Sequence, residues 1–304
     1  MYEQTPLPEG SEVSVAAEAG QIAVRKTYKL YVGGAFCRSS AGRTFEVRDH
    51  AGGFLGNAAL ASRKDARDAV TAARGAVSGW SEISAYHRGR ALYRVAEVLQ
   101  GRRAEFASEV RLATGMPGDD ALAEVDAAVD RWVWYAGWAD KIAQVRGGVN
   151  PVAGPFANLS VPEPSGVAAV LAPQDSALLG LVSVLAPAIV GGGTCVAVAS
   201  FRYPLPAVAL AEVLAAAELP GGIVNMLTGQ VADIAPWLAS HMDVNAIDVT
   251  GAPGGLADDL AVAAAGSNLK RVLRLPPADW TAEPGVDRMF GYLETKTIWH
   301  PMGW

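Results

Sequence analysis

The sequence predicts an α/β fold in which an open sheet of five parallel strands has helices on both faces. From residue 166 onward, short apolar runs bounded by Gly and Pro alternate with segments of helix length. The runs begin at residues 167, 194, 222, 245 and 270, so their starts are 27, 28, 23 and 25 residues apart, about one strand–helix step. The chain is also 51% hydrophobic and 18% charged, so it can bury a large core. The predicted strands are residues 167–172, 194–199, 222–227, 245–250 and 270–275.

The region before this sheet is predicted to form short strands and then three helices. Residues 28–60 alternate strand-like runs with glycine pairs. Ser62 followed by Asp65 is a capping-box pattern at the start of the first helix, whose apolar residues extend to Val77. The third helix spans about residues 119–142. The second helix has its apolar residues on one face, namely Leu92, Val95, Ala96 and Leu99.

The third helix carries an aromatic cluster. Trp132, Trp134, Tyr135 and Trp138 lie close together along it. Such a cluster could stack a ligand, but at helical spacing it is more typical of a buried core or an interface. We therefore expect these rings to pack inside the protein or against a neighbour.

The stretch from Ser176 to Ser200 has no charged side chain and is long enough to span a bilayer. However, Pro187 and the glycines at 191–193 divide it into a helix-length piece and a strand-length piece. The pattern therefore predicts a buried helix–strand unit and no membrane span.

The two ends of the chain differ from the middle. Residues 1–26 contain no basic segment followed by an apolar run, so they are predicted to be a flexible lead-in without a secretion signal, and the protein is expected in the cytoplasm. Residues 277–287 are predicted to be a linker. In the strand-like segment that follows, alternate positions hold Leu293, Thr295, Thr297 and Trp299.

Charge and composition exclude several classes of function. The chain has 25 Lys and Arg against 31 Asp and Glu, a net charge of −6, so it has no basic surface for nucleic acid or an anionic membrane. Cys37 and Cys195 are too few for a disulfide framework, and the four histidines are far apart in sequence. No metal site is predicted.

Several short motifs, in order, resemble the aldehyde dehydrogenase superfamily. They are KLYVGG, SGW, YAGWADKI, VPEPSGVAAVLAP, LPGGIVNMLTG, VTG and NLKRV. The resemblance covers about residues 29–275 and returns at about 291–300. It implies a Rossmann-like dinucleotide-binding domain and a β-arm for oligomerisation. The implied organisation is a lead-in at 1–26, N-terminal strands and helices at 27–147, the arm at 148–163, the dinucleotide-binding part at 164–276, and a linker with a C-terminal arm strand at 277–304.

The chain departs from this family where the chemistry would occur. Family members carry a catalytic domain with a nucleophilic cysteine between the two matching regions, whereas here only residues 276–290 connect them. Cys37 lies in the N-terminal strand region, and Cys195 lies inside a predicted strand, where it would be a small buried hydrophobe. Because a thiolate nucleophile needs an activating environment, neither cysteine is expected to replace the missing one.

Other positions of the family's active site also differ. Where the family has Pro-Trp-Asn-Phe-Pro, whose Asn stabilises the oxyanion, this chain has Asp175, which would repel that charge. Where the family has Lys-Pro-Ser-Glu, which binds the adenosine ribose, this chain has Val198 and Phe201. The family's Leu-Glu-Leu-Gly-Gly supplies a general base, but this chain has Arg274, which stays protonated. The resemblance therefore implies no catalytic residue in this chain.

A vestigial nucleotide cleft is expected outside the carboxyl ends of the strands. Gly251 could let the backbone approach a pyrophosphate, or it could serve only the strand-to-helix turn. Because the ribose contacts are missing, no cofactor is predicted, and weak NAD(P) binding is the alternative. Asp175 is the best candidate for a new role. The predicted rim consists of Pro173, Gln174, Asp175, Val198, Ser200, Gly229, Gly251 and Ala252.

The arm suggests the function. In the family it adds strands to the catalytic domain of a neighbouring subunit, so an arm in a chain without that domain implies an acceptor on another protein. The predicted partner is an intact aldehyde dehydrogenase, in which this chain would be a structural or regulatory subunit. The chain is similar to the second unit, lacking catalytic residues, of a branch of the family that joins two units.

Three alternatives stay open. The chain could be an aldehyde oxidoreductase that binds NAD(P) weakly at an unusual site. It could be a scaffold that also holds an aldehyde-producing enzyme beside the dehydrogenase. It could be a decayed copy without function, although its apolar periodicity and turn residues are intact.

Overall fold

A seven-stranded sheet runs through the body of the protein in the computed structural model, which describes residues 26–276 and 279–303. Its strand order is β12-β11-β8-β9-β10-β2-β3. The five predicted strands are present and pair in parallel, which confirms the predicted fold class. They are β8 (Val167–Leu171), β9 (Thr194–Val198), β10 (Val224–Leu227), β11 (Ala246–Asp248) and β12 (Arg271–Leu273).

Two further strands join this sheet from the N-terminal region. The hairpin of β2 (Leu30–Val32) and β3 (Ala35–Cys37) turns at Gly33 and Gly34, whose φ angles are +61° and +87°. It attaches antiparallel to β10 through the pairing of Tyr31 with Met226. The sequence predicted short strands here but not their place in the main sheet, because that pairing joins residues far apart in the chain.

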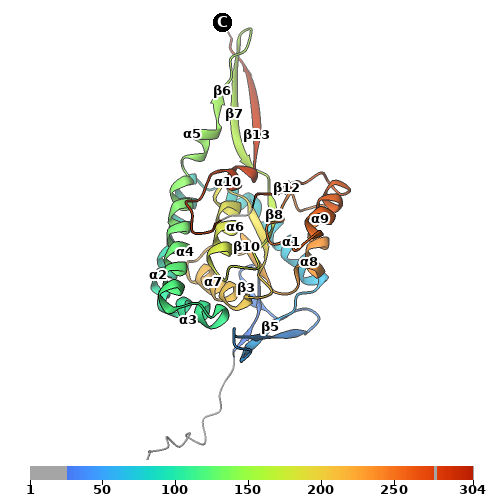
Figure 1. Ribbon diagram of the computed structural model, residues 1–304. Coiled ribbons are helices and arrows are strands. Elements are labelled where there is room, and N and C mark those ends of the chain that lie inside the picture. Colours follow the sequence, from blue (N-terminus) through green and yellow to red (C-terminus); the bar gives the residue numbers. More distant parts are fainter. Residues whose placement is uncertain (1–25, 277–278, 304) are drawn as a thin grey trace, which may run out of the picture.

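Helices cover both faces of the sheet (Figure 1), and alternate residues of each strand face the two cores. For example, Ala168 and Val170 face one core, whereas Val167 and Ala169 face the other. This alternation explains why the strands are apolar throughout, since both faces are buried. The connecting helices are α6 (Leu179–Val190), α7 (Pro204–Ala216), α8 (Val231–Ala239) and α9 (Leu256–Ala265).

The N-terminal helices begin where the sequence predicted. Ser62 Oγ accepts a hydrogen bond from the Asp65 amide at 3.3 Å, and the Asp65 carboxylate accepts one from the Ser62 amide at 2.7 Å, which confirms the capping box. One helix, α3, was not predicted separately. The helices are α1 (Arg63–Glu82), α2 (Ala85–Gly101), α3 (Arg103–Thr114), α4 (Gly118–Trp138) and α5 (Ile142–Arg146).

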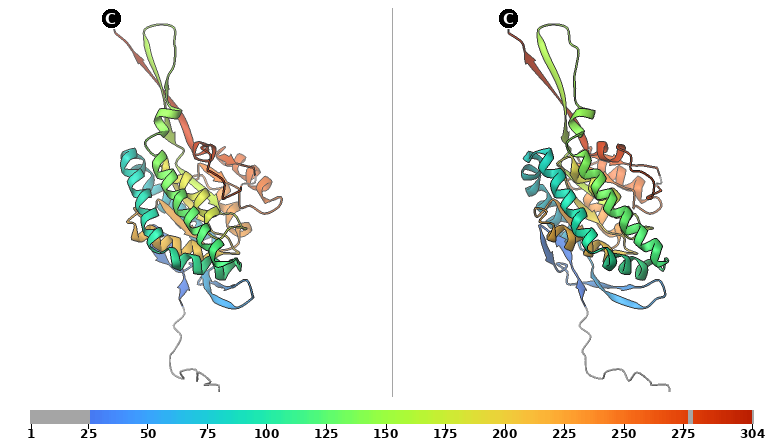
Figure 2. Two further views of the ribbon diagram at one scale, coloured as in Figure 1. Left: turned by 60° about the vertical axis from the view of Figure 1, so that its left-hand side comes forward. Right: turned by 90° about the vertical axis from the view of Figure 1, so that its left-hand side faces the viewer.

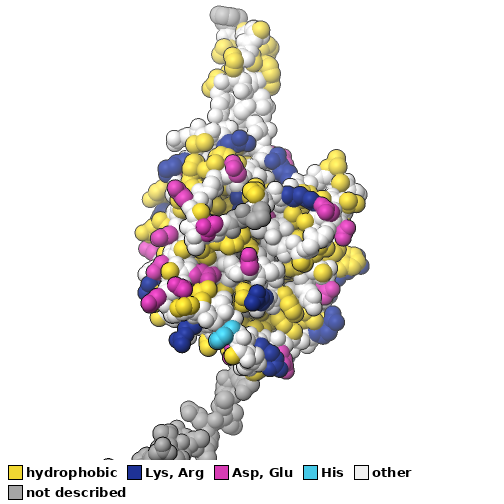
Figure 3. Space-filling model, in the orientation of Figure 1, with side chains coloured by type: hydrophobic (Ala, Val, Ile, Leu, Met, Phe, Trp, Pro, Cys, Tyr) yellow, Lys and Arg dark blue, Asp and Glu magenta, His cyan; other side chains and the backbone are white. Residues whose placement is uncertain are grey.

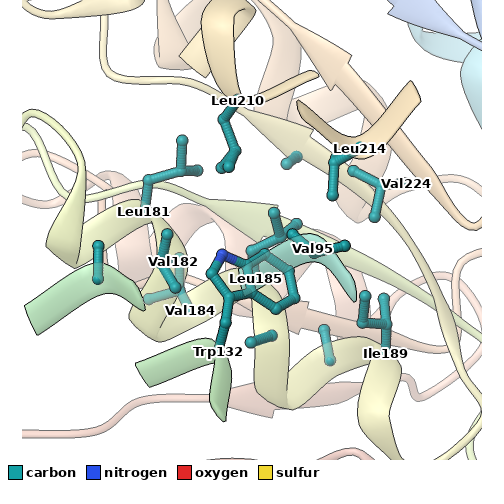
Figure 4. Packing of buried hydrophobic residues seen from close by; sticks show 14 of the residues in the cluster. Val95, Trp132, Leu181, Val182, Val184, Leu185, Ile189, Leu210, Leu214 and Val224 are labelled. Atoms are coloured by element: carbon teal, nitrogen blue, oxygen red, sulfur yellow. The ribbon is translucent and has the colours of Figure 1, made fainter. Parts of the chain in front are cut away.

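The aromatic cluster of α4 is mostly core, as its spacing predicted. Trp132 is fully buried against Val182 and Leu185 of α6 (Figure 4), and Tyr135 is also buried. Trp134 and Trp138 are partly buried, and their rings lie 5.5 Å apart. Trp138 also contacts Phe290 of α10 (Asp287–Gly291), so the cluster packs against the core and against the C-terminal segment.

The uncharged stretch from Ser176 to Ser200 folds as the predicted buried unit, with α6 followed by β9. Pro187 lies inside α6 and does not end it, whereas Gly191 follows its last residue. In the part of the chain that the structure describes, no helix is long and apolar enough to cross a membrane.

Two smaller sheets lie outside the main one. The first, with order β1-β5-β4, contains β1 (Thr27–Tyr28), β4 (Thr44–Arg48) and β5 (Phe54–Ala59). The second is an arm that extends away from the body (Figure 2), with order β13-β7-β6. It is built from β6 (Gly148–Val149), β7 (Phe156–Pro164) and β13 (Leu293–Pro301). The C-terminal strand thus pairs with the predicted arm segment over nine positions.

A buried acidic side chain lies where α3 meets β1 and α7. Glu109 Oε2 is buried and has no hydrogen-bond partner within the described residues. Burial raises the pKa of this carboxyl to about 7; Glu105 and Glu212 raise it further, whereas Lys26 and Arg102 oppose the shift. The folded protein therefore holds the Glu109 proton more tightly than the unfolded chain does.

We expect this group to make the protein less stable as pH rises. Between about pH 4.5 and 7 the folded state binds more protons than the unfolded state, so stability falls across this window, by up to about 3 kcal/mol. Glu109→Gln should remove most of that decline. Urea unfolding at several pH values measures the pH dependence of stability in the wild type and in the variant. An unchanged pH dependence in Glu109→Gln would contradict the assignment of this decline to Glu109.

Candidate functional site

A cavity of about 660 Å³ lies at the carboxyl ends of β8 and β11, where the sequence predicted a cleft. Trp280, from the segment after β12, also lines it. The charged side chains on its wall are Asp175, Arg202 and Arg274. The structure thus brings five of the eight predicted rim residues together, namely Pro173, Gln174, Asp175, Gly251 and Ala252.

The other three predicted rim residues do not line this cavity. The prediction that all eight residues lie on one rim is therefore corrected. Val198 is the last residue of β9 and is fully buried in the core. Ser200 is buried below the rim, where its Oγ accepts a hydrogen bond from the Tyr203 amide at 3.2 Å. Gly229 follows β10 and packs close to Leu60 and Ile234. The strands β8, β9 and β10 end in register, at Leu171, Val198 and Leu227, so these residues stay in the sheet, and the cavity is lined by the loops that follow β8 and β11.

Two polar side chains hold the loop between β8 and α6 in place. The Gln174 Oε1 atom accepts a hydrogen bond from the Phe201 amide at 2.9 Å, and its Nε2 donates to the Ala172 carbonyl at 2.8 Å. Glu124 of α4 accepts from the amides of Leu178 and Leu179 at 2.9 and 3.1 Å, which caps the start of α6. The loop that carries Asp175 is therefore well anchored.

Asp175 itself is exposed and contacts no donor or cation that the structure describes within hydrogen-bond or ion-pair distance. It lines this cavity and a neighbouring one between α4, α6 and Trp280. A free carboxylate at this point would oppose an oxyanion.

Gly251 is explained by close packing. A Cβ atom at this position would lie 1.9 Å from the Ala172 carbonyl oxygen, and the Gly251 amide donates to the Leu171 carbonyl at 3.0 Å. The turn after β11 therefore lies directly on the end of β8. Of the two explanations that the sequence left open, turn geometry accounts for the glycine without a ligand.

Gly251→Ala is expected to destabilise the protein strongly. Because the added methyl group would meet backbone atoms of β8, which cannot move without disturbing the sheet, we expect a loss of about 3 kcal/mol or more. Chemical denaturation measures the loss. Gly254→Ala in the same loop is the control, because its added Cβ has open space; the strain of its positive φ of +51° should cost about 1 kcal/mol.

The cationic side chain at the position where the resemblance led us to expect a base is already paired. Arg274 contacts the Asp258 carboxylate at 2.6 Å and donates to the Ala257 carbonyl at 2.5 Å. Asp258 and Asp259 lie in the first turn of α9, where their charge favours the helix but disfavours a phosphate. The arrangement at the start of α9 therefore does not favour a pyrophosphate.

Neither cysteine has the environment of a nucleophile. Cys195 is fully buried in β9, and burial raises the pKa of its thiol far above the ordinary value. Burial and the nearby Asp65 also raise the pKa of Cys37, in β3. Both thiols are thus disfavoured as thiolates. The described residues contain no group of three His, Cys, Asp or Glu side chains placed to hold a metal ion.

The segment between β12 and β13 folds back over the end of the sheet. It contains the short helix α10 (Asp287–Gly291). Arg131 of α4 donates to the Trp280 and Ala282 carbonyls at 2.7 and 3.0 Å. The described residues of the predicted linker are therefore packed against the body of the protein.

A buried ion pair fastens the end of this segment. Arg288 contacts the Asp248 carboxylate, and the Tyr292 hydroxyl donates to the same carboxylate at 3.0 Å. Thr250 donates to Asp248 Oδ1 through its amide at 3.0 Å and through its hydroxyl at 2.5 Å. Sequence reasoning missed this cluster, although an Asp at the end of an apolar strand was a visible signal.

The predicted oligomerisation residues divide into two groups. Thr295, Thr297 and Trp299 are exposed on the arm, and Thr297 Oγ1 lies 3.2 Å from Ser160 Oγ. Leu293 is buried at the base of the arm beside Gly191, so its side chain is not available to a partner. The opposite face of the arm exposes Ile298, which the sequence did not single out.

Comparisons with known proteins agree with this architecture. The profile of the aldehyde dehydrogenase family matches residues 36–274. The chain is 34% identical over 248 residues to mitochondrial aldehyde dehydrogenase family 2 member B4 of Arabidopsis thaliana, covering 80% of this chain and 45% of that protein. It is 32% identical over 257 residues to human cytosolic 10-formyltetrahydrofolate dehydrogenase, covering 82% and 28%. The chain spans about half, or less, of the length of these curated relatives.

Solved structures show the same relationship. PnpE from Pseudomonas sp. WBC-3 superposes with a TM-score of 0.75 and 31% identity, covering 81% of this chain and 50% of that one. Indole-3-acetaldehyde dehydrogenase AldA of P. syringae superposes with a TM-score of 0.76 and 27% identity, covering 82% and 50%. The AldA structure contains NAD, as does a second structure of PnpE.

Proposed function

The chain belongs to the aldehyde dehydrogenase family, and from this premise we propose that it is a subunit without dehydrogenase activity that assembles with an intact, NAD-dependent aldehyde dehydrogenase. The proposal rests mainly on the shortness of the segment that connects β12 to β13. The described residues of this segment, 274–276 and 279–292, close over the end of the sheet through Arg131 and the Asp248–Arg288 pair. The space in which the family's catalytic domain would begin is thus used by this chain for its own packing.

The chemistry of the site supports the absence of catalysis. Both thiols are disfavoured as nucleophiles, Asp175 stands at the oxyanion position, and Arg274 at the base position is paired with Asp258. One such difference would permit a variant mechanism. Several together argue against a reaction in which the described residues of the cleft would attack an aldehyde and stabilise the oxyanion.

The arm supports a partner. Strand β13 is an edge strand of the arm, so its outer edge offers unpaired backbone groups over its whole length. Its tip exposes Trp299 beside Phe156, with ring centroids 6.0 Å apart, and Figure 3 shows hydrophobic side chains along the arm. A strand from another polypeptide would form hydrogen bonds with these backbone groups and cover the aromatic side chains at the tip.

A second apolar surface lies near the base of the arm. Val262 of α9, Met242 and Leu269 are among the most exposed large hydrophobic side chains, at 74%, 65% and 81%. Asn268, next to Leu269, donates to the Met242 carbonyl at 2.7 Å, so the two loops adjoin. Arg271 of β12 lies 3.7 Å from Glu294 of the arm, which makes this surface continuous with β13. One partner could therefore cover this apolar surface and the outer edge of β13.

The native mass of the tagged chain, purified gently from its own host, tests the proposal. We expect an assembly that contains this chain and an aldehyde dehydrogenase of roughly full family length, identified by mass spectrometry. A homodimer without a companion, or mixed chains that elute separately at micromolar concentration, would overturn it. An aldehyde-producing enzyme found in the same assembly would add a partner and leave the subunit role intact.

The alternative of an oxidoreductase that binds NAD(P) weakly predicts a different result. Trp280 lines the cleft, so a bound dinucleotide should change the intrinsic tryptophan fluorescence. We expect no saturable change up to millimolar NAD or NADP, because the charged ribose contacts, worth about 1.5–3 kcal/mol each, are absent. A saturable change that Trp280→Phe abolishes would favour the alternative.

A further inference from the structure

We propose that a small pocket between α4 and the segment after β12 binds the carboxylate group of a small amino acid. The pocket has a volume of about 220 Å³. Four buried side chains contribute to its wall, namely Arg131, Tyr135, Ser183 and Arg288. This inference goes beyond the proposed function, although one segment serves both: Arg131 and Arg288 hold the passage from β12 to β13, and Trp280 lines the cleft as well as this pocket.

The two arginines keep free donors at this pocket. A guanidinium has five N–H groups. Arg131 uses three of them, for Ser183 and for the Trp280 and Ala282 carbonyls. Arg288 uses two, for Asp248 and Thr250. Within the described residues the remaining N–H groups have no acceptor; both side chains are more than nine-tenths buried, but none of the nitrogen atoms without a partner is itself fully enclosed, so they are open to the pocket. A bidentate carboxylate is the ligand group that fits such donors.

Tyr135 adds a third donor. Its side chain is only 2% exposed, yet its hydroxyl has no hydrogen-bond partner among the described residues. Burial raises the pKa of this phenol to about 12, with Arg131 and Arg288 opposing the shift, so it remains a protonated donor at neutral pH. The hydroxyl oxygen is not itself fully enclosed, so it is accessible from the pocket. A ligand carboxylate in the pocket would supply a hydrogen-bond partner.

The buried charges of this region do not balance. Arg131 and Arg288 are buried cations, and Asp248 is the one buried carboxylate that pairs with either in the described chain. Arg131 contacts only neutral acceptors, and burial lowers its pKa. A buried charge without a counter-ion is costly. An anionic group between the two guanidiniums would remove that cost.

The rim of the pocket has the opposite charge. Asp279, Glu283 and Asp287 line its outer part and are exposed. The ring of Trp280 forms a further part of the wall. A ligand with a carboxylate at one end and an ammonium group at the other would match the buried cations and the exposed acids at once. This pattern selects an amino acid over a simple carboxylic acid.

Isothermal titration calorimetry of the purified chain with three probes tests the proposal. We expect 4-aminobutyrate to bind, butyrate to bind about threefold more weakly because exposed ion pairs contribute little, and butylammonium not to bind. The absence of saturable binding of both acids in the millimolar range would overturn the site. If butylammonium bound as tightly as 4-aminobutyrate, the carboxylate site would also be overturned. If butyrate bound as tightly as 4-aminobutyrate, the role of the acidic rim would be overturned.

A pair of tyrosine variants separates binding from folding. Tyr135→Phe removes the free hydroxyl and should weaken 4-aminobutyrate binding about tenfold, since this donor has no other partner. Tyr292→Phe is the matched control, because its hydroxyl contacts Asp248 and does not line the pocket. It should leave binding unchanged. An unchanged affinity in Tyr135→Phe, or an equal loss in both variants, would contradict the assignment.

Discussion

Asp248→Ala is expected to lower the free energy of unfolding by about 3–5 kcal/mol. The carboxylate is fully buried and contacts Arg288, Tyr292 and both polar groups of Thr250. Removing it leaves the Arg288 guanidinium, whose side chain is 9% exposed, without its carboxylate. Because a buried unpaired charge costs more than the ion pair contributes, the loss should be large. Urea unfolding followed by circular dichroism measures it.

A double substitution distinguishes the ion pair from simple packing. Asp248→Leu combined with Arg288→Met removes both charges and keeps apolar volume. We expect it to be less destabilised than Asp248→Ala, because no charge is left buried alone. If the double variant loses as much stability as the sum of the single ones, the cluster acts through packing and not through charge.

Trp299→Ala should weaken binding of the partner subunit by about 100-fold. Trp299 lies at the tip of the arm, is 59% exposed and packs against Phe156. Large exposed aromatic side chains of this kind are typical interface hot spots, whose truncation costs at least about 2 kcal/mol. Surface plasmon resonance against the copurified dehydrogenase measures the change in affinity.

The matched control for this experiment is Tyr86→Ala on α2, which removes an aromatic side chain that is 64% exposed on the body. It should leave the affinity unchanged, because α2 is not part of the arm. Equal affinities for wild type and Trp299→Ala would show that the arm does not mediate assembly. The apolar surface of Met242, Val262 and Leu269 would then be the next candidate.

Much of the local structure could be predicted from the sequence. The capping box depends on Ser62 and Asp65, which are close together in the chain, and the helical spacing of the aromatic residues predicted a packed face that includes the buried Trp132. The five parallel strands are recognisable because a strand buried on both faces must be apolar throughout. The same patterns led to the family, whose profile matches residues 36–274.

The site required the tertiary structure. Gln174 lines the cleft because it lies in the loop beyond the end of β8, whereas Val198 is still within β9 and faces the core. Likewise, Leu293 alternates correctly with Thr295 but is buried where the arm joins the body. Periodicity assigns a residue to a face of its own strand and says nothing of what covers that face.

By itself, the sequence therefore determined the fold class and the order of the strands along the chain, and it predicted that these residues lack the family's catalytic groups. Only the tertiary structure decided that β2 and β3 extend the main sheet and that the segment after β12 is locked by Asp248 and Arg288. The physical reason is the range of the interactions. Periodicity and caps act between near neighbours, whereas the Asp248–Arg288 and Tyr31–Met226 contacts join distant segments that only the packed core brings together.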